Sequence, residues 1–401
     1  MAPGIILGML RMDVAERRRR LGSRHGLHPS AQASDPLEAA RRVVALHATD
    51  PASVFLAVRA RSPRATPASV EDALYDRRDL VRMLGMRRTV FVVPTDLMRV
   101  IGASTMRRVA DTQRRHLLKQ LREAGVADNT EGWLAEVECA VLAALTKRGG
   151  TAIATELAAD EPRLRTSLLM AEGKPYEARQ NITSRVLLLL GAEGHIVRGR
   201  PTGSWLSQRY QWTLAELWSS DAQEPTSPRA ARAELARQWL AAFGPAPVAD
   251  LRWWTGWSAT EVKQAVGDLH VTEVDLGDTV GIVLTDDLER TPATAEPWVA
   301  FLPALDPTVM GWSDRGWFLG DHEKALFDRN GNAGPTVWLG GRIVGGWAQR
   351  PDGEVAVKLL EDIGSDHLSL VTAEAARLTE WLGDARIIPR FRTPTERELS
   401  A

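Results

Sequence analysis

A dense polar cluster interrupts an apolar run at residues 47–51 of the chain. His47, Thr49 and Asp50 follow a helix-like stretch and precede Pro51. In an extended segment, side chains two residues apart point to the same side, so His47 and Thr49 could act together. A neutral imidazole can accept a proton from water while a threonine hydroxyl holds that water, which is hydrolytic chemistry. The carboxylate of Asp50 could stabilise a developing positive charge.

The same residues also fit a purely structural interpretation. Asp50 before Pro51 is typical of a helix N-cap followed by proline at the first helical position. His47 would then be favoured by the C-terminal dipole of the preceding helix, and Thr49 would bond the local backbone. Residue chemistry alone leaves both interpretations open, so the rest of the chain must decide.

The composition indicates an ordinary globular protein of two or three domains. The chain has 401 residues, of which 44% are hydrophobic and 25% charged. A single cysteine, Cys139, excludes an intramolecular disulfide framework and a cysteine-rich zinc site. The apolar stretch at residues 5–10 is too short to span a bilayer and lacks a preceding basic residue. We therefore expect a cytoplasmic protein that does not bind membranes.

The charge is distributed unevenly along the chain. Residues 1–120 contain 22 Lys and Arg but only 11 Asp and Glu, whereas the net charge of the whole chain is −1. A basic segment joined to an acidic remainder predicts a face that meets a polyanion. Nucleic acid is favoured over membrane lipid, because no segment is a basic amphipathic helix with a Trp or Phe face.

Several enzyme classes lack their signature in this sequence. There is no phosphate-binding G-x-x-x-x-G-K-[ST] loop, no dinucleotide-binding G-x-G-x-x-G turn, no H-E-x-x-H and no G-x-S-x-G. The eight histidines are scattered and show no metal-ligand spacing on one element. We expect neither a metal nor an organic cofactor.

Three stretches of the chain repeat one order of elements, which is helix, short helix, second helix and strand pair. This order is the winged-helix plan, so the predicted fold class is α+β with tandem winged-helix domains and a C-terminal β-rich region. The predicted domains are residues 13–125 (with a basic helix from 95 to about 124), 126–222, 223–290 and 291–401.

Within these domains, the apolar spacing and the cap signals predict individual elements. The expected helices are 35–46, 51–61, 67–75, 133–146, 177–190, 228–243 and, late in the chain, 373–382. The expected strand pairs include 80–86 with 89–94, and 272–275 with 279–284. Twelve of the fourteen tryptophans lie between residues 205 and 347, and Trp253, Trp254 and Trp257 at helical spacing favour core packing over base stacking.

The residues that surround the polar cluster resemble those of AlkZ-like winged-helix proteins. The succession "RRRRLGSRHGL", "RRVVALHATDPASVFLAVRAR" and "LVRMLGMRRTVFVVPTDL" is similar to theirs, as are "FLPALDPTVMGWSDRGWFLG" and "VWLGGRIVGGWAQR". The resemblance covers roughly residues 13 to 395. In the family, the helix ends in Gln-x-Gln or Gln-x-Asp, and these polar side chains position the attacking water. They fall on His47 and Thr49 here.

Three further positions depart from the family pattern. Arg88 stands where the family has Gly in Met-Arg-Gly-Thr, Phe91 replaces its following His, and His25 replaces the Gln of Gln-Gly-Leu. The family includes bacterial DNA glycosylases that excise alkylated purines and unhook interstrand crosslinks. The resemblance therefore implies a monofunctional DNA glycosylase in repair or in self-resistance to a genotoxin. The alternative is a non-catalytic DNA-binding or regulatory protein.

The expected partner is double-stranded, damaged DNA, bound by a monomer associated with the nucleoid. The expected catalytic residues are His47, Thr49 and Asp50. The expected DNA-binding residues are Arg20, Arg59, Arg61, Arg87, Arg88, Arg185, Arg198, Arg200 and Arg315. Arg315 could instead form an ion pair with Asp306. If His47 works as a base, its protonation below about pH 6.5 should lower the rate.

Overall fold

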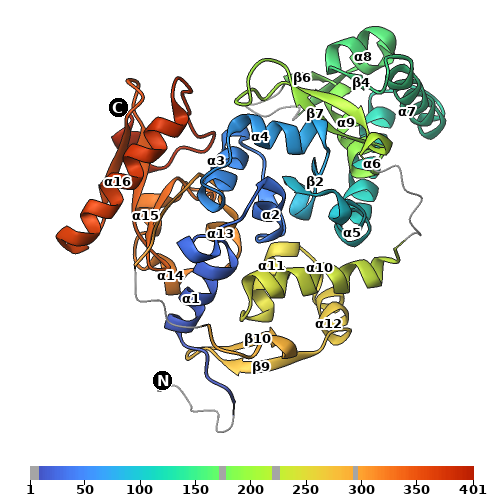
Figure 1. The fold of residues 1–401 in the computed structure, drawn as a ribbon. Helices are drawn as coiled ribbons and strands as arrows, with labels where there is room; N and C mark the ends of the chain where they lie inside the picture. The colour runs from blue at the N-terminus through green and yellow to red at the C-terminus, as the bar shows by residue number, and fades with distance from the viewer. Residues whose placement is uncertain (1–8, 171–177, 219–225, 292–296) are drawn as a thin grey trace.

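The computed structural model describes residues 9–170, 178–218, 226–291 and 297–401. Helices and antiparallel strands are mixed along these ranges, so the chain is α+β as predicted. Figure 1 shows the N-terminal elements near the centre of the molecule, with the C-terminal elements on one side and α7 and α8 on the other. Among the helices in these ranges, none has both the length and the apolar character needed to cross a bilayer.

The N-terminal part is built from short, capped helices and one hairpin. Its elements are α1 (Val14–Arg24), α2 (Pro36–Arg41), β1 (Leu46–His47), α3 (Pro51–Arg61), α4 (Pro67–Glu71), β2 (Leu80–Leu84) and β3 (Val90–Pro94). The four helices begin at Asp13, Asp35, Asp50 and Thr66, whose side chains each accept a hydrogen bond from a backbone N–H in the first turn. The predicted starts of α2, α3 and α4 are confirmed, whereas α1 was not predicted. The helix expected at 35–46 is wrong at its end, because the chain leaves α2 after Arg41 and enters β1.

A six-stranded antiparallel sheet joins this hairpin to a second one. The strand order is β1-β3-β2-β7-β8-β4, with β7 at Ile196–Pro201, β8 at Tyr210–Leu214 and β4 at Thr151–Ala152. The two hairpins meet through β2 and β7, where Arg82 is the register partner of Arg198. The sheet is therefore continuous across the domain boundary that the sequence predicts between residues 125 and 126.

Helices cover the region between the two hairpins. They are α5 (Met98–Ile101), α6 (Arg107–Glu123), α7 (Thr130–Lys147), α8 (Ala154–Asp160) and α9 (Thr183–Ala192). The helix expected at 177–190 is wrong in its first part. Residues 178–181 form the exposed strand β6, paired with β5 (Ser167–Met170), because the buried apolar spacing begins only at Ile182. Residue 177 lies outside the described ranges.

The next part follows the predicted order closely. It contains α10 (Pro228–Phe243), α11 (Val248–Thr255), α12 (Ala259–Gly267) and the hairpin of β9 (Val271–Asp275) and β10 (Val280–Leu284). The predicted helix 228–243 and the predicted strand pair are confirmed. Figure 1 shows this hairpin beside the N-terminal segment. There the backbone of Arg11 forms an isolated parallel β-bridge with that of Asp275.

The C-terminal part combines a four-stranded sheet with helices. The strands are β11 (Val299–Leu302), β12 (Thr336–Leu339), β13 (Arg342–Gln349) and β14 (Val355–Leu359), in that order and all antiparallel. The helices are α13 (Pro307–Met310), α14 (Gly316–Leu319), α15 (Glu323–Leu326), α16 (Gly364–Leu382) and α17 (Pro394–Leu399). The expectation of a single late helix at 373–382 is wrong, since α16 starts at Gly364 and four other helices accompany it.

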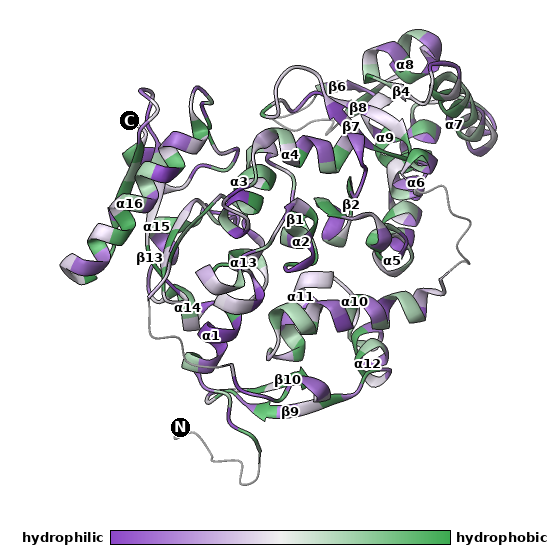
Figure 2. Ribbon diagram, in the orientation of Figure 1, coloured by the Kyte–Doolittle hydropathy of each residue, from purple (hydrophilic) through white to green (hydrophobic). Residues whose placement is uncertain are grey.

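The hydrophobic core contains most of the tryptophans and, unexpectedly, part of the basic run. Trp239, Trp338 and Trp347 are fully buried. Helix α1 is among the most hydrophilic segments in Figure 2, yet Arg17 and Arg20 on it are buried. The run of four arginines at 17–20 is therefore not a simple solvated face.

Candidate active site

The segment that follows α2 is held as a strand at the edge of the sheet. Val44 adopts a left-handed conformation (φ 64°), although it is β-branched and buried. This conformation costs roughly 1–2 kcal/mol, and it turns the chain from α2 into β1. His47 then lies opposite Phe91 of β3, and the backbone N–H of Ala48 donates to the carbonyl of Val90 (2.8 Å). The sheet therefore fixes the backbone on which His47 and Thr49 stand.

The imidazole of His47 is held neutral. Its ring meets the ring of Phe91 edge-on, with 5.3 Å between centroids. Burial, together with the nearby charge of Arg87, lowers the pKa of His47 to about 3. Its Nδ1 is buried and has no hydrogen-bond partner among the described residues. A neutral ring with an unused nitrogen can accept a hydrogen bond from a water molecule.

Thr49 and Asp50 differ in the hydrogen bonds that their side chains make within the protein. Thr49 is half-buried, and no hydrogen bond of its hydroxyl is found within the described ranges. Asp50 is buried, and both of its oxygens are engaged: Oδ1 accepts from the N–H of Ala52 (3.1 Å) and Oδ2 from that of Arg390 (2.9 Å). Burial also raises the pKa of Asp50. Asp50 therefore caps α3 and ties down the C-terminal tail, as its N-cap interpretation predicts.

The tip of the β2–β3 hairpin carries two strained arginines beside this segment. Arg87 (φ 54°, ψ 32°) and Arg88 (φ 61°) are both left-handed, and the N–H of Thr89 closes the turn on the carbonyl of Met86 (3.0 Å). A turn of this kind favours Asn or Gly at both central positions. Both arginine side chains are exposed, and neither is within ion-pair distance of a carboxylate in the described ranges. The turn thus holds two cations without ion-pair partners in the described ranges, and the charge of Arg87 acts on His47.

Trp253 supports these cations from α11. The guanidinium of Arg87 lies 4.2 Å from the centroid of the Trp253 ring, and that of Arg315 lies 5.1 Å from it. Arg315 also donates to the carbonyl of Trp312 (2.9 Å). Trp254 and Trp257 are buried in the core, as predicted. Trp253 is only half-buried, and two guanidinium groups pack against its ring. Two guanidiniums on one indole, without carboxylate partners of their own in the described ranges, form a site that suits an anion.

The second hairpin brings further arginines toward the same segment. Arg198 is half-buried and lies over Tyr210 and Trp212, with 5.6 Å and 5.4 Å from its guanidinium to the ring centroids. Arg200 is exposed but is paired with Asp76 (2.8 Å). Arg185 bonds the side-chain oxygen of Gln120, farther along the chain's helical region.

Three of the expected DNA-binding arginines are instead engaged within the protein. Arg20 bonds Glu16 (2.7 Å) and Asp287 (3.2 Å), and Arg59 pairs with Glu374. Arg61 is completely buried and binds both carboxylate oxygens of Asp306 (2.7 and 2.9 Å). Desolvated guanidiniums with bidentate or multiple partners cannot also reach a phosphate. The structure gives these three side chains a structural role in place of DNA contact.

The alternative pairing of Arg315 with Asp306 is wrong for the same reason. The carboxylate of Asp306 is occupied by Arg61 and caps α13 through the N–H of Thr308 (2.8 Å). The guanidinium of Arg315 instead packs against the rings of Trp253 and Phe327. It lies 4.9 Å from the centroid of the Phe327 ring.

The comparison with protein families decides the identity of the fold. The family model for DNA glycosylase AlkZ-like proteins matches residues 40–381. The chain belongs to the AlkZ-like DNA glycosylase family. Membership supports DNA as the molecule on which this AlkZ-like chain acts and hydrolysis as its reaction class.

A solved structure shows the same fold. The DNA glycosylase AlkZ of Streptomyces sahachiroi superposes with a TM-score of 0.73 at 22% sequence identity, covering 94% of this chain and 99% of that chain. Identity at this level shows a shared fold only. A comparison with curated proteins gave no match.

The remaining variant position of this AlkZ-like chain, His25, is structural. It is fully buried, with Nδ1 2.9 Å from Thr308 Oγ1 and Nε2 3.1 Å from the carbonyl of Ala242. Burial lowers the pKa of His25 well below its usual value. In the part of the chain that the structure describes, no group of three or more His, Cys, Asp or Glu side chains is placed to hold a metal ion.

Two contributors to the site were not predicted from the sequence: Trp253, whose ring packs against cations, and Arg82, which contacts the backbone of the segment. Arg82 lies in the otherwise apolar strand β2, and its side chain is buried with the core residues. A lone arginine inside a Val- and Leu-rich strand was the available signal, because such a charge is kept in a core only with partners.

Proposed function

We propose that the chain is a monofunctional DNA glycosylase that excises alkylated purines, with N7-alkylguanine adducts as its main substrates and interstrand crosslinks within its range. Repair or self-resistance to a genotoxin would be the biological setting. The supporting observation is the segment 47–49 itself, in which a neutral imidazole with an unpaired Nδ1 stands near a hydroxyl without a partner in the described structure. The tandem winged-helix plan and a monomeric, cytoplasmic state belong to the same proposal.

Cleavage of the bond between an N7-alkylated purine and its sugar requires little catalytic help from the protein. Alkylation at N7 makes guanine cationic, so the C1′–N9 bond breaks with its electron pair going to the purine and without prior protonation. The sugar develops oxocarbenium character, a water oxygen bonds to C1′, and one proton of that water must leave. The products are the free base and a deoxyribose with a hydroxyl group at C1′. Aiming the water is the main task left for side chains.

His47 performs this task as an acceptor and not as a strong base. An imidazole with a pKa of about 3 does not retain a proton near neutral pH. It can nevertheless hold the water by accepting a hydrogen bond, with the hydroxyl of Thr49 as a second contact, while the proton passes on to solvent or to DNA phosphate. A neutral, oriented acceptor is also what the glutamine of the resembling family would supply. The variant segment is therefore chemically equivalent for aiming water.

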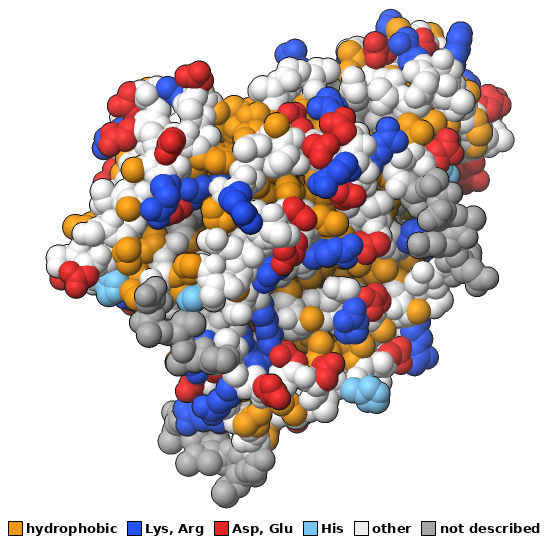
Figure 3. Space-filling model, in the orientation of Figure 1, with side chains coloured by type: hydrophobic (Ala, Val, Ile, Leu, Met, Phe, Trp, Pro, Cys, Tyr) orange, Lys and Arg blue, Asp and Glu red, His pale blue; other side chains and the backbone are white. Residues whose placement is uncertain are grey.

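DNA enters this proposal through the uncompensated arginines. Arg87, Arg88 and Arg315 on one side of the segment, and Arg198 on the other, would contact backbone phosphates on both sides of the lesion. Figure 3 shows that basic and acidic side chains are interspersed on the face it presents. These four arginines are therefore chosen for their places at the two hairpins and beside Trp253, and none of them pairs with a carboxylate in the described ranges. Most phosphate contacts carry no sequence information, so binding should tolerate any sequence.

The pH dependence of excision follows from the lowered pKa of His47. We expect the single-turnover excision rate to be constant between about pH 5 and 8, because His47 stays neutral throughout this range. This replaces the loss below pH 6.5 that the sequence alone predicts. The rate on one N7-methylguanine duplex, measured across this range and corrected for spontaneous loss, is the test. A midpoint near 6.5 that disappears in His47→Gln would contradict it.

Salt dependence tests the role of the hairpin tip. Reversing the charges of Arg87 and Arg88 to glutamate should weaken duplex binding and flatten the dependence of log K on log salt concentration by about 1.8, because each lost phosphate contact removes about 0.9 from the slope. Titrations at several salt concentrations measure this. Arg229→Glu, far from the segment and paired with Asp268, is the control and should leave the slope unchanged. Equal slopes for all three proteins would remove the tip from the interface.

A further inference from the structure

Arg82 is a buried cation that touches the candidate catalytic segment. It lies in β2, is 1% exposed and has no carboxylate within ion-pair distance in the described ranges. Its Nη1 donates to the hydroxyl of Tyr210 (2.5 Å) and lies 3.5 Å from the carbonyl oxygen of Ala48, while its Nε has no partner there. Burying a guanidinium without a carboxylate is costly. The contact with Ala48 is notable because this residue stands between His47 and Thr49.

Tyr210 connects Arg82 to the second hairpin. The ring of Tyr210, on β8, has the guanidinium of Arg82 4.5 Å from its centroid and that of Arg198 5.6 Å from it. Arg82 and Arg198 are also register partners across the single point at which β2 and β7 pair. Like charges directly opposite one another repel. The contacts thus run from Arg198, which reaches solvent, through Tyr210 and Arg82 to the backbone of Ala48.

The carboxylate of Asp50 is an anion close enough to interact with Arg82, although beyond ion-pair distance, and a phosphodiester at Arg198 would add a second one. Arg82 itself is too deeply buried to contact DNA, whereas Arg198 is half-buried. A negative charge at Arg198 would offset its repulsion of Arg82 and favour a close arrangement of Arg198, Tyr210 and Arg82. That arrangement would hold the carbonyl of Ala48, and with it the direction of the side chains at 47 and 49.

We propose that Arg82 is a positioning residue that couples phosphate binding at Arg198 to the placement of the 47–49 segment. This inference rests on the proposed function, since it assigns the segment a reaction to perform. In this proposal the second hairpin both binds a DNA phosphate through Arg198 and fixes the position of the 47–49 segment.

The primary test compares Arg82→Met with Arg82→Lys in single-turnover excision. Arg82→Met should lower the maximal rate roughly tenfold or more, because a small misplacement of an aligned group is expensive. The duplex dissociation constant should change by less than about threefold, since phosphate contacts dominate it. Arg82→Lys should recover part of the rate, because an ammonium can still bond one of the two acceptors. A higher dissociation constant with an unchanged maximal rate would overturn the proposal.

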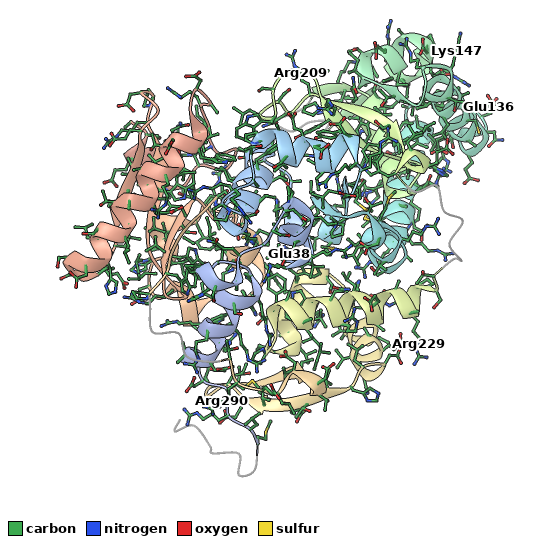
Figure 4. All side chains as sticks on the ribbon, viewed as in Figure 1. Glu38, Glu136, Lys147, Arg209, Arg229 and Arg290 are labelled. Atoms are coloured by element: carbon green, nitrogen blue, oxygen red, sulfur yellow. The ribbon has the colours of Figure 1, made fainter. Side chains whose placement is uncertain are left out.

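Two further variants separate positioning from general destabilisation. Tyr210→Phe removes only the hydroxyl that accepts from Arg82, keeps the ring, and should lower the maximal rate in the same direction. Arg229→Met is the control, because Arg229 lies at the start of α10, away from the 47–49 segment (Figure 4), and its partner is Asp268. Thermal denaturation of each variant shows whether it is folded at the assay temperature. A full maximal rate in folded Tyr210→Phe and Arg82→Met would contradict the proposal.

Coupling between the two arginines is the sharpest measurement. In the wild type, Arg198→Met should raise the dissociation constant and also lower the maximal rate. In an Arg82→Met background, the same substitution should raise the dissociation constant and leave the maximal rate where it is, because the contact is already broken. Independent, multiplicative losses of maximal rate would mean that the two side chains act separately.

An observation that needs no catalysis distinguishes this proposal from the proposed function. The ring resonances of His47 in isotope-labelled protein should shift when undamaged duplex DNA is added, and Arg82→Met should reduce this shift at equal saturation. A wild type that excises nothing but shows this pattern would end the glycosylase proposal and retain the coupling. Identical shifts in both proteins would end the coupling.

Discussion

Replacing His47 by alanine should lower the rate of base excision roughly 10²-fold or more, because losing the group that aligns the attacking water can cost this much. The imidazole is the neutral acceptor of the 47–49 segment, and alanine leaves the water without that acceptor. Duplex affinity should change little, because the arginines around the segment are untouched. Single-turnover release of N7-methylguanine, with binding measured in parallel, gives both quantities.

Substitution by glutamine separates orientation from basicity. If His47 acts as a neutral acceptor, His47→Gln should keep most of the activity that His47→Ala loses, because a carboxamide oxygen also accepts a hydrogen bond from water. Thr49→Ala should cost less than His47→Ala, since a second water can replace a hydroxyl that only orients the first. The double variant His47→Gln with Thr49→Gln should retain or raise activity, unless Phe91 and Arg88 have reshaped the pocket around the imidazole.

The outcomes distinguish a DNA glycosylase from a non-catalytic DNA-binding or regulatory protein. Unimpaired excision by His47→Ala would remove His47 from the mechanism. Excision by none of the proteins, with duplex binding intact in all, would favour the alternative of a non-catalytic DNA-binding or regulatory protein. A bulkier N7 adduct should be assayed beside N7-methylguanine, because a negative result with one small lesion would not exclude a larger one.

Stability against pH offers a check on His47 that does not involve DNA. The pKa of His47 is about 3 in the folded protein and near its ordinary value of 6.5 in the unfolded chain. Between these values the unfolded chain binds more protons, so the free energy of unfolding falls as the pH is lowered from 6.5. His47→Gln lacks this group and should become more stable relative to the wild type over that window.

Local signals in the sequence predicted the backbone of the site well. Asp50 followed by Pro51 marked the start of α3, and the Val-rich runs marked the hairpin that pairs with His47. These predictions succeeded because caps, turns and strand patterns depend on neighbours a few residues away.

What the sequence could not predict depends on partners far along the chain. Arg59 was predicted to bind DNA because its carboxylate partner, Glu374, lies hundreds of residues later. For Arg20 the same holds for Asp287, whereas its other partner, Glu16, is only four residues away. The lowered pKa of His47 likewise depends on burial and on Arg87, in the turn between β2 and β3. Basic residues in a basic segment are therefore sorted into structural and functional groups only by tertiary contacts. Arg87, Arg88, Arg198 and Arg315 are among the arginines that form no ion pair in the described ranges.

Removal of the Asp306 carboxylate should be the most damaging single change to stability. Asp306→Ala is expected to lower the free energy of unfolding by about 3–5 kcal/mol, the cost of leaving a buried guanidinium unpaired. Both side chains of the Arg61–Asp306 pair are 0% exposed. Arg61 also donates to the hydroxyl of Thr308 (2.7 Å), which contacts His25, so the pair joins the ends of α1 and α3 to α13. Urea unfolding measures the loss.

A matched surface pair and a double replacement make this prediction specific. Asp268→Ala removes the carboxylate partner of exposed Arg229 and should cost less than about 1 kcal/mol, as surface ion pairs do. Replacing Arg61 by Met and Asp306 by Leu together should cost less than Asp306→Ala alone, because no buried charge is left without its partner. The DNA affinity of the folded double variant should match the wild type if Arg61 is structural. Wild-type stability in Asp306→Ala combined with weaker DNA binding would instead return Arg61 to the DNA interface.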